Sequence, residues 1–336
     1  MDSYLIELQE IESAKITILV DNITDRLLPS SSLVKRSPFV RNQKIVESPI
    51  AEHGFSAILE ITYMHRNTIK TNKFLFDTGV SKDGIVKNSE ILGIDLEDVE
   101  TIVLSHGHFD HISGLINTLK RIKKPIEIIV HPEAFSRRWL VFPDGNRARM
   151  DFLDEGEITK VGGIIRKLDE INFLPRDDQT DKIKTGMAKN NRVIITGRIP
   201  RVTNFEKGFP LQYKEENNEN NLVPDPMVND DQALVMNVRK KGLIVLTGCG
   251  HAGIINTVRF AKKITGVSKI YCIIGGFHLS GSGYEESIPI TISELKKEDP
   301  DYIVPCHCTG WKAVNEIINS LPGKFIQPSV GSTFQF

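Results

Sequence analysis

The chain contains 336 residues, of which 40% are hydrophobic and 25% are charged. This composition permits one large core or two smaller ones and excludes a fibrous or low-complexity protein. The 42 basic and 43 acidic residues are interspersed and leave a net charge of −1, so the chain offers no single-sign surface for nucleic acid or an anionic membrane. We therefore expect a soluble globular protein without nucleic-acid or membrane partners.

The N-terminal region and the cysteines bear on the cellular compartment. The first 20 residues include Glu7, Glu10 and Glu12, where a signal peptide requires a cationic start and an apolar block. No run of about 18 apolar residues could span a bilayer, and we expect a cytoplasmic protein with reduced thiols rather than a disulfide framework. A structural zinc site around the last two cysteines is the alternative. The four are Cys249, Cys272, Cys306 and Cys308.

Predicted strands and helices alternate along the chain. Apolar, β-branched segments bounded by turn residues predict strands at 15–22, 55–62, 73–76, 101–104, 126–130, 192–196, 232–238, 243–246, 270–274 and 302–304. Apolar residues at helical spacing predict helices at 84–92, 112–121, 253–264, 287–297 and 311–319. This interleaving indicates a layered α/β architecture.

One segment differs in composition from the rest of what we expect to be a single domain spanning 1–336. Residues 136–191 are rich in Arg, Lys, Asp and Gly, with short apolar words, and separate two predicted core strands. We expect an inserted lid or small subdomain there. The polar stretch 214–221 (KEENNENN) is interpreted as a solvated tip.

Four side chains that bind transition metals fall within six residues, directly after the predicted strand at 101–104: His106, His108, Asp110 and His111. Zinc and neighbouring first-row metals accept imidazole nitrogen and carboxylate oxygen as ligands. On an extended loop His106 and His108 point the same way and can hold one ion, whereas Asp110 and His111 lie where a helix begins and can face a second. A metal-free histidine-rich loop is the alternative, and we favour a catalytic metal centre.

These four residues match in full the HxHxDH signature of the metallo-β-lactamase-fold superfamily, which the chain resembles. The resemblance implies a four-layer αββα fold, with two sheets packed face to face and helices on both outer sides. It also implies that Asp77, in an Asp-Thr-Gly word, accepts a hydrogen bond from a metal-ligating histidine and fixes its tautomer. A histidine ending a late strand supplies the last ligand in the family, which assigns His307 to the Asp110 and His111 ion.

Two further strands end in glycine-rich turns with a histidine. His251, with Cys249 just before it, is our first choice as third ligand of the His106 and His108 ion. Most family members carry a bridging Asp where this chain has Cys249, so either the thiolate contributes to a metal or the bridging position is empty and the second site is weakened. We interpret His278 as a substrate or transition-state contact, with an additional metal ligand as the alternative.

Several short sequence segments resemble those of one subgroup of the superfamily, the dihydropterin ribofuranosyl aminobenzene phosphate synthases. Among them are residues 230–233 (DDQA), 247–254 (TGCGHAGI) and 275–279 (GGFHL). The resemblance implies work on a pterin phosphate compound. It also places a group of polar residues near the mouth of the site, and two arginines are candidates for holding an anionic group, with surface ion pairs as their alternative. These substrate-binding candidates are Asp21, Asn22, Glu52, His53, Arg198 and Arg201.

Together these features predict a metal-dependent hydrolase with one or two ions, zinc in the first place and manganese or iron as alternatives. Such ions would lower the pKa of a bound water from about 15.7 toward 7, and Asp110 could orient the resulting hydroxide. We expect a small anionic substrate of phosphorylated or ester type, such as a pterin phosphate. The alternatives are a noncatalytic metal-stabilised binding protein and an iron-dependent redox protein on the same fold. The sequence leaves a homo-oligomer open.

Overall fold

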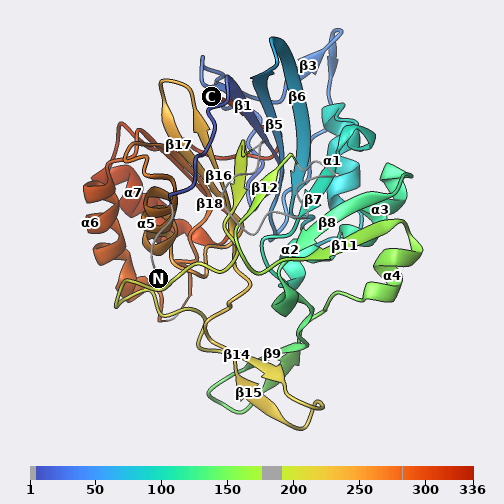
Figure 1. The fold of residues 1–336 in the computed structure, drawn as a ribbon, viewed down its shortest axis with the longest axis vertical. Helices are drawn as coiled ribbons and strands as arrows, with labels where there is room; N and C mark the ends of the chain where they lie inside the picture. Colours follow the sequence, from blue (N-terminus) through green and yellow to red (C-terminus); the bar gives the residue numbers. More distant parts are fainter. Residues whose placement is uncertain (1–4, 176–190, 282) are drawn as a thin grey trace.

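Two large β-sheets pack face to face at the centre of the computed structural model, which describes residues 5–175, 191–281 and 283–336. Figure 1 shows helices on the outer side of each sheet, so that the layers run helix, sheet, sheet, helix. The predicted α/β fold with four αββα layers is therefore confirmed.

The first sheet contains eight strands and carries helices α1 (Gly84–Leu92), α3 (Leu115–Ile122) and α4 (Glu155–Lys160) on its outer face. Its strands β6, β7, β8 and β11 run parallel, and the others pair antiparallel. In spatial order they are β11 (Gly163–Lys167), β8 (Ile126–Val130), β7 (Thr101–Val103), β6 (Thr68–Phe76), β5 (Ser56–His65), β1 (Ser13–Val20), β20 (Thr333–Gln335) and β2 (Val34–Lys35).

The second sheet has six strands and is covered by α5 (Ile254–Thr265), α6 (Ile288–Glu298) and α7 (Trp311–Ser320). Its last three strands are parallel, which places their carboxyl ends at one edge. In spatial order they are β12 (Asn172–Leu174), β13 (Val193–Ile195), β16 (Ala233–Val238), β17 (Gly242–Thr247), β18 (Ile270–Gly276) and β19 (Tyr302–Cys306).

Strand alternation divides the apolar side chains between the layers. In β5, Leu59 and Ile61 point into the core between the sheets, whereas Ile58 packs under the helices of the first sheet. In β18, Ile274 enters the same central core while Ile273 packs under the helices of the second sheet. Because successive residues of a strand face opposite sides, strands with apolar residues at every position bury both faces.

A small separate sheet lies at one end of the molecule, below the two large sheets in Figure 1. Its strands come from two distant parts of the chain. They are β10 (Arg147–Arg149), β9 (Arg138–Val141), β14 (Gln212–Glu215) and β15 (Leu222–Pro224). The polar stretch 214–221 covers the end of β14 and the turn before β15. A second minor pair consists of β3 (Val40–Arg41) and β4 (Lys44–Ile45).

The segment 136–191, expected to be a lid or subdomain, is shared among three sheets in its described part. Strands β9 and β10 belong to the small sheet, β11 extends the first sheet beside β8, and β12 pairs with β13 in the second sheet. Residues 176–190 lie outside the described residues. A lid function for this segment stays a prediction.

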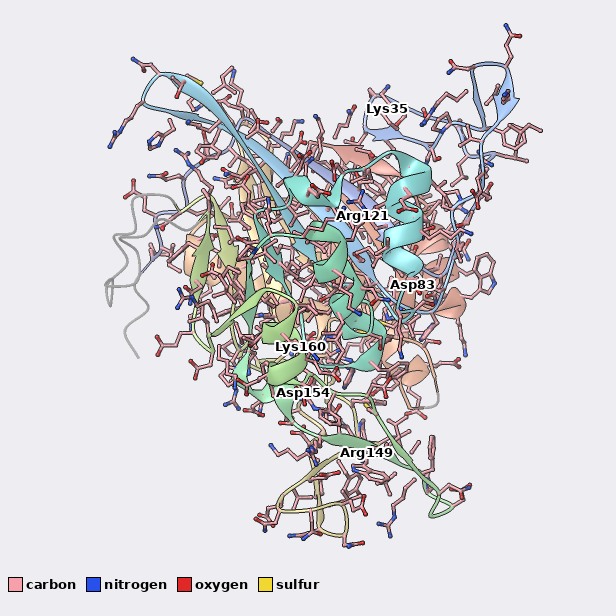
Figure 2. All side chains as sticks on the ribbon, turned by 90° about the vertical axis from the view of Figure 1, so that its right-hand side faces the viewer. Lys35, Asp83, Arg121, Arg149, Asp154 and Lys160 are labelled. Atoms are coloured by element: carbon pink, nitrogen blue, oxygen red, sulfur yellow. The ribbon has the colours of Figure 1, made fainter. Side chains whose placement is uncertain are left out.

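The outer layer of the first sheet displays charges of both signs. Figure 2 shows Asp83, Arg121, Asp154 and Lys160 along this face, on or beside α1, α3 and α4. Asp154 also caps α4, since its carboxylate accepts a hydrogen bond from the Glu157 backbone N–H at 2.9 Å. Throughout the part of the chain that the structure describes, no helix is both long and apolar enough to cross a membrane.

Candidate metal centre

Four loops that leave the carboxyl ends of parallel strands meet between the two sheets. The HxHxDH loop follows β7, the turn with Cys249 and His251 follows β17, and His278 and His307 follow β18 and β19. Open α/β sheets place their binding sites at this edge because the loops there converge. Segments that lie far apart in the sequence and carry the candidate ligands are thus brought together at one edge.

The loop after β7 turns directly into the short helix α2 (Phe109–Ile112). His106 and His108 precede the helix, and Asp110 and His111 lie on it. The helix predicted at 112–121 is interrupted here, and α3 begins only at Leu115. At the interruption Gly114 packs closely against the loop after β6, since a Cβ atom there would lie 2.1 Å from the Thr78 carbonyl oxygen.

His106, His108 and His251 form the first group of candidate ligands. Their ring centroids lie 4.4, 4.9 and 4.7 Å apart, and His108 Nδ1 is 3.0 Å from His251 Nε2. Burial lowers the pKa of His106 and His251 well below 6.5 and that of His108 to about 4, so all three rings are neutral with a free lone pair. His106 Nε2 is buried without a hydrogen-bond partner among the described residues, an arrangement that fits a metal ion.

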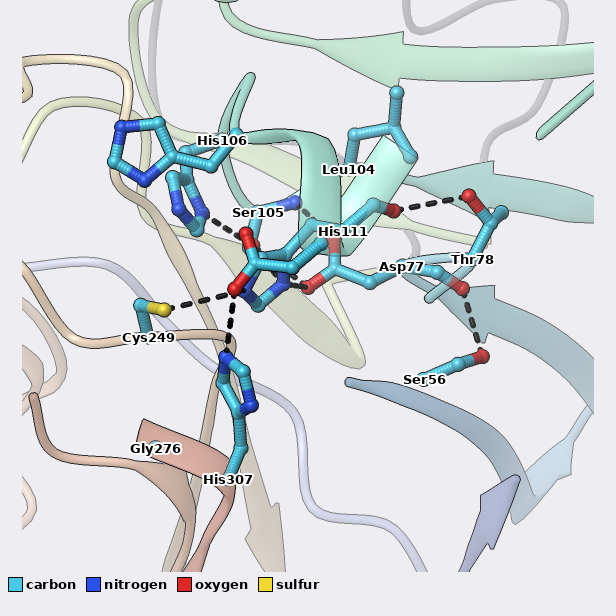
Figure 3. Close-up of polar contacts among 12 residues, drawn as sticks. Ser56, Asp77, Thr78, Leu104, Ser105, His106, His111, Cys249, Gly276 and His307 are labelled. Carbon is cyan, nitrogen blue, oxygen red and sulfur yellow. Dashed lines mark hydrogen bonds and ion pairs between the residues drawn. The ribbon is translucent and has the colours of Figure 1, made fainter. Parts of the chain in front are cut away.

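Asp110, His111, Cys249 and His307 form the second group, with one ligand atom from each lying within 4.8 Å of the others. His111 Nε2 is 3.1 Å from Cys249 Sγ, and His307 Nε2 is 3.1 Å from Asp110 Oδ2 (Figure 3). Cys249 Sγ also lies within 4.8 Å of ligand atoms of His106 and His251. The thiol therefore lies between the two groups.

Asp77 contacts His111 on the side away from the ligand group, as Figure 3 shows. Its Oδ2 lies 2.6 Å from His111 Nδ1, and its two oxygens also accept hydrogen bonds from the Ser105 N–H and hydroxyl at 2.6 and 2.7 Å. Burial disfavours a charged His111, but the Asp77 and Asp110 carboxylates outweigh it and raise the pKa of His111 to about 9. Asp77 thus holds His111 with Nε2 facing the ligand group.

His278 lies beside both groups. Its ring centroid is 4.1 Å from that of His251, and a ligand atom of His278 lies within 4.8 Å of the thiols of Cys249 and Cys308. Its Nδ1 is buried and has no hydrogen-bond partner within the described ranges. This position agrees with both interpretations drawn from the sequence, a substrate contact and an additional ligand.

Three of the residues predicted at the mouth of the site, Asp21, Asn22 and His53, lie around His307. Asp21 is buried, and its Oδ1 accepts a hydrogen bond from the His307 N–H at 2.7 Å. The Asn22 amide lies 3.2 Å from His307 Nδ1 and 3.2 Å from His53 Nδ1. Glu52 accepts a hydrogen bond from the Ser81 N–H at 3.2 Å. Asp21 and Asn22 therefore orient a candidate ligand, a role that the sequence did not reveal, and substrate binding by these residues stays a prediction.

The two arginines proposed to hold an anion have different surroundings. Arg201 donates to the carbonyl oxygen of His251 at 2.9 Å and to that of Met227, so its guanidinium stabilises the turn that carries a candidate ligand. This explains the side chain without any bound anion. Arg198 is exposed, and anion binding by it stays a prediction.

Sequence reasoning missed the residues that hold the loop 105–111, here called the metal loop, from the side of the small sheet. Gln212 Oε1 accepts a hydrogen bond from His108 Nε2, although 104 residues separate them. Asp230 accepts from the Gly107 N–H at 2.8 Å and binds Arg138 through both oxygens. Gln212 carries no local signal, since no apolar pattern marks its short strand, and Arg138 gains its role only through carboxylates 87 and 92 residues away.

A pocket of about 810 Å³ opens beside His251 and His278. Most of its lining is apolar, and Phe142, Phe277 and Tyr284 contribute to it. The Tyr284 hydroxyl donates to the Gly208 carbonyl oxygen at 3.1 Å and so ties together two loops that border the pocket. The site thus combines a polar ligand cluster with an apolar space large enough for a small molecule.

The layered fold and the convergent histidines define a metallo-β-lactamase architecture. The model of the metallo-beta-lactamase superfamily matches residues 66–262, and the chain belongs to this superfamily. Among curated proteins it is 33% identical to the 7,8-dihydropterin-6-methyl-4-(beta-D-ribofuranosyl)-aminobenzene-5'-phosphate synthase of Methanocaldococcus jannaschii, over 94% of this chain and 98% of that protein.

Two other similarities extend over most of the chain. An uncharacterised protein of the same organism, MJ0448, is 30% identical over 84% of this chain and 92% of its own length. A crystal structure of a metal-dependent hydrolase of the beta-lactamase superfamily superimposes with a TM-score of 0.66 at 24% identity, covering 96% of this chain and 98% of that one. The likeness to this crystal structure shows the fold alone.

Proposed function

We propose that this protein is a metal-dependent hydrolase that holds one or two ions, zinc in the first place. The observation that carries the proposal is the convergence of two ligand groups that share Cys249, one rich in neutral imidazoles and one containing Asp110. Nitrogen, thiolate and carboxylate donors together suit zinc better than magnesium or calcium, and manganese or iron are the alternatives. His106, His108 and His251 would hold one ion, and Asp110, His111, Cys249 and His307 the other.

Zinc at such a site supplies Lewis acidity, which makes water nucleophilic at neutral pH and polarises the bond under attack. The chain's own residues have complementary tasks. Asp77 and Asn22 orient His111 and His307 through their outer nitrogens. His278, whose buried Nδ1 has no hydrogen-bond partner among the described residues, is placed to contact an oxygen of the substrate.

The substrate that we propose is an anionic, ring-containing small molecule such as a pterin phosphate. The apolar pocket beside His251 and His278 supports a ring system, because apolar walls favour burial of a flat, poorly hydrated group. The relative from Methanocaldococcus jannaschii is named as a 7,8-dihydropterin-6-methyl-4-(beta-D-ribofuranosyl)-aminobenzene-5'-phosphate synthase. That name supports the compound class, whereas cleavage of an ester or phosphoester bond by water is our proposal from the site.

Turnover assays on metal-loaded protein test this function. We expect chelator-sensitive turnover of at least one compound in a panel of pterin phosphates, phosphodiesters, lactones and thioesters. His108→Ala should reduce turnover to the level of metal-stripped protein and lower the zinc content, because it removes a ligand of the first ion. His65→Ala is the matched control, since His65 ends β5 roughly 30 Å along the strand from Ser56, which contacts Asp77.

A noncatalytic metal-stabilised binding protein is the competing outcome. It would retain zinc through the same ligands, bind a pterin phosphate in calorimetry and turn over nothing in the panel. Wild-type protein that retains no transition metal after purification without chelators would contradict both functions.

A further inference from the structure

We propose that the small sheet is a working part of the metal centre, because Gln212 on β14 fixes the tautomer of His108 and thereby presents Nδ1 to the ion. Gln212 is a positioning residue in this proposal, which rests on the proposed metal site. The sequence suggested only that part of this region forms a lid. The structure instead places a side chain of the small sheet in direct contact with a candidate ligand.

The orientation of the Gln212 amide follows from its other partners. Its Nε2 donates hydrogen bonds to the backbone oxygen and to Oδ2 of Asp225, both at 2.9 Å. Both donors of the amide group are thereby used, so Oε1 faces His108. An amide oxygen only accepts, and His108 Nε2 must therefore carry the proton in this contact.

The tautomer of His108 decides which nitrogen can bind a metal. A neutral imidazole has one protonated nitrogen and one free lone pair. With the proton on Nε2, the lone pair is on Nδ1, which lies 3.0 Å from His251 Nε2 in the first ligand group. The opposite tautomer would direct a proton into the ligand group and leave two acceptors facing each other at Gln212.

The acceptor is itself held by a buried charged network. Arg138 on β9 donates to Asp225 Oδ2 at 3.3 Å and to both oxygens of Asp230 at 2.9 and 2.6 Å. Asp230 in turn accepts from the N–H of Gly107, the residue before His108. Arg138 is 1% exposed, and Gln212 and Asp230 are fully buried. The small sheet is therefore joined to the metal loop directly, through Gln212 and the His108 ring, and indirectly, through Arg138 and Asp230 to the Gly107 backbone.

If Gln212 had a purely structural role, its substitution would lower the stability of the fold. It would not change the tautomer of His108, and it would not weaken the binding of one ion selectively. The alternatives are separated by zinc affinity, measured by competition with a chromophoric chelator. In Gln212→Leu we expect about 10–100-fold weaker binding of one ion, the usual effect of removing the partner of a ligating histidine. The affinity for the other ion should change less than about threefold, because its ligands have separate partners.

Histidine nitrogen NMR of the metal-free protein gives a readout that does not depend on metal or turnover. In the wild type, the resonances that disappear in His108→Ala should report protonation at Nε2. In Gln212→Leu they should shift toward a mixture of tautomers. Gln212→Asn is a milder second variant that keeps an amide for Asp225 while withdrawing the oxygen from His108, and we expect the same direction of change.

A further variant provides a control. Trp139→Phe removes a different hydrogen bond of the small sheet, from Trp139 Nε1 to Glu215 Oε1 at 2.9 Å, and should leave zinc affinity unchanged.

The inference is overturned if Gln212→Leu and Gln212→Asn bind zinc within twofold of the wild type, or if Trp139→Phe loses as much affinity as they do. An unchanged His108 tautomer in both variants would overturn it as well. The proposed hydrolase function can fail independently. In that case Gln212→Leu would still bind zinc more weakly than the wild type, while the wild type itself would turn over no substrate.

Discussion

His278 lies beside the candidate ligands, and its buried Nδ1 has no hydrogen-bond partner in the described part of the chain. It follows the Gly275–Gly276 pair with a φ of 43°, and its ring lies 4.6 Å from that of Tyr284 at the edge of the pocket. If it contacts substrate, His278→Ala should leave the zinc content unchanged and lower kcat by about a hundredfold, the usual effect of losing one donor to a developing oxyanion. Elemental analysis and steady-state kinetics on the same preparation measure both quantities.

The competing interpretation of His278 as a ligand gives the opposite pattern. Its neighbours Cys249 and Cys308 could complete a set with it, and His278→Ala would then lose as much zinc as His108→Ala. His278→Gln is informative here, because a glutamine can donate a hydrogen bond to substrate but binds zinc poorly. Partial recovery of turnover in His278→Gln would exclude the ligand role.

At this scale the sequence predicts residues that share a compact signature and misses residues defined by tertiary contact. His106, His108, Asp110 and His111 are recognisable because the signature packs four metal-binding side chains into six residues. Gln212 is not, because its role depends on an approach between segments 104 residues apart. The same limit applies to Asp21 and Asn22, whose contacts with His307 span 286 and 285 residues.

The metal loop is an element with little room for change. A Cβ atom on Gly107 would lie 2.2 Å from the Ala134 carbonyl oxygen and 2.7 Å from its Cα, both backbone atoms that cannot rotate away. Gly107→Ala should therefore displace the loop between His106 and His108. We expect a loss of about 1–3 kcal/mol in the free energy of unfolding, measured by urea denaturation of the metal-free protein, together with weaker zinc binding.

Gly323→Ala is the matched control for this loop, because an added Cβ there meets nothing within 4 Å in the described part of the chain. Its stability and zinc affinity should equal those of the wild type. If Gly107→Ala behaved in the same way, the contact with Ala134 would not constrain the loop.

Elements with strong periodicity were predicted well, and short exposed ones were not. The helix at 84–92 has the predicted bounds, and the strands at 126–130 and 233–238 agree with prediction within one residue. Strand β10, with the sequence Arg-Ala-Arg, is exposed at every position. Such a strand buries no face and has no alternating pattern, so only its partner β9 defines it.

At the scale of the whole molecule, one strand of the first sheet, β20, was not predicted from the sequence. Strand β20 has only three residues, yet it lies between β1 and β2 in the first sheet, whereas the preceding strand β19 belongs to the second sheet. The chain end therefore crosses from one sheet to the other. Phe334, which pairs with Ile16 and Val34, is fully buried in the core between the sheets.

Because Phe334 packs in the apolar cluster that both sheets share, its loss should weaken the fold as a unit. We expect Phe334→Ala to lower the free energy of unfolding by about 3–5 kcal/mol, the usual range for truncating a buried phenylalanine. Phe39→Ala makes the same chemical change at a side chain that is 44% exposed and should cost below about 1 kcal/mol. Circular dichroism and tryptophan fluorescence should report one common transition in both variants. Two separate transitions in Phe334→Ala would mean that the sheets unfold independently and that this core does not couple them.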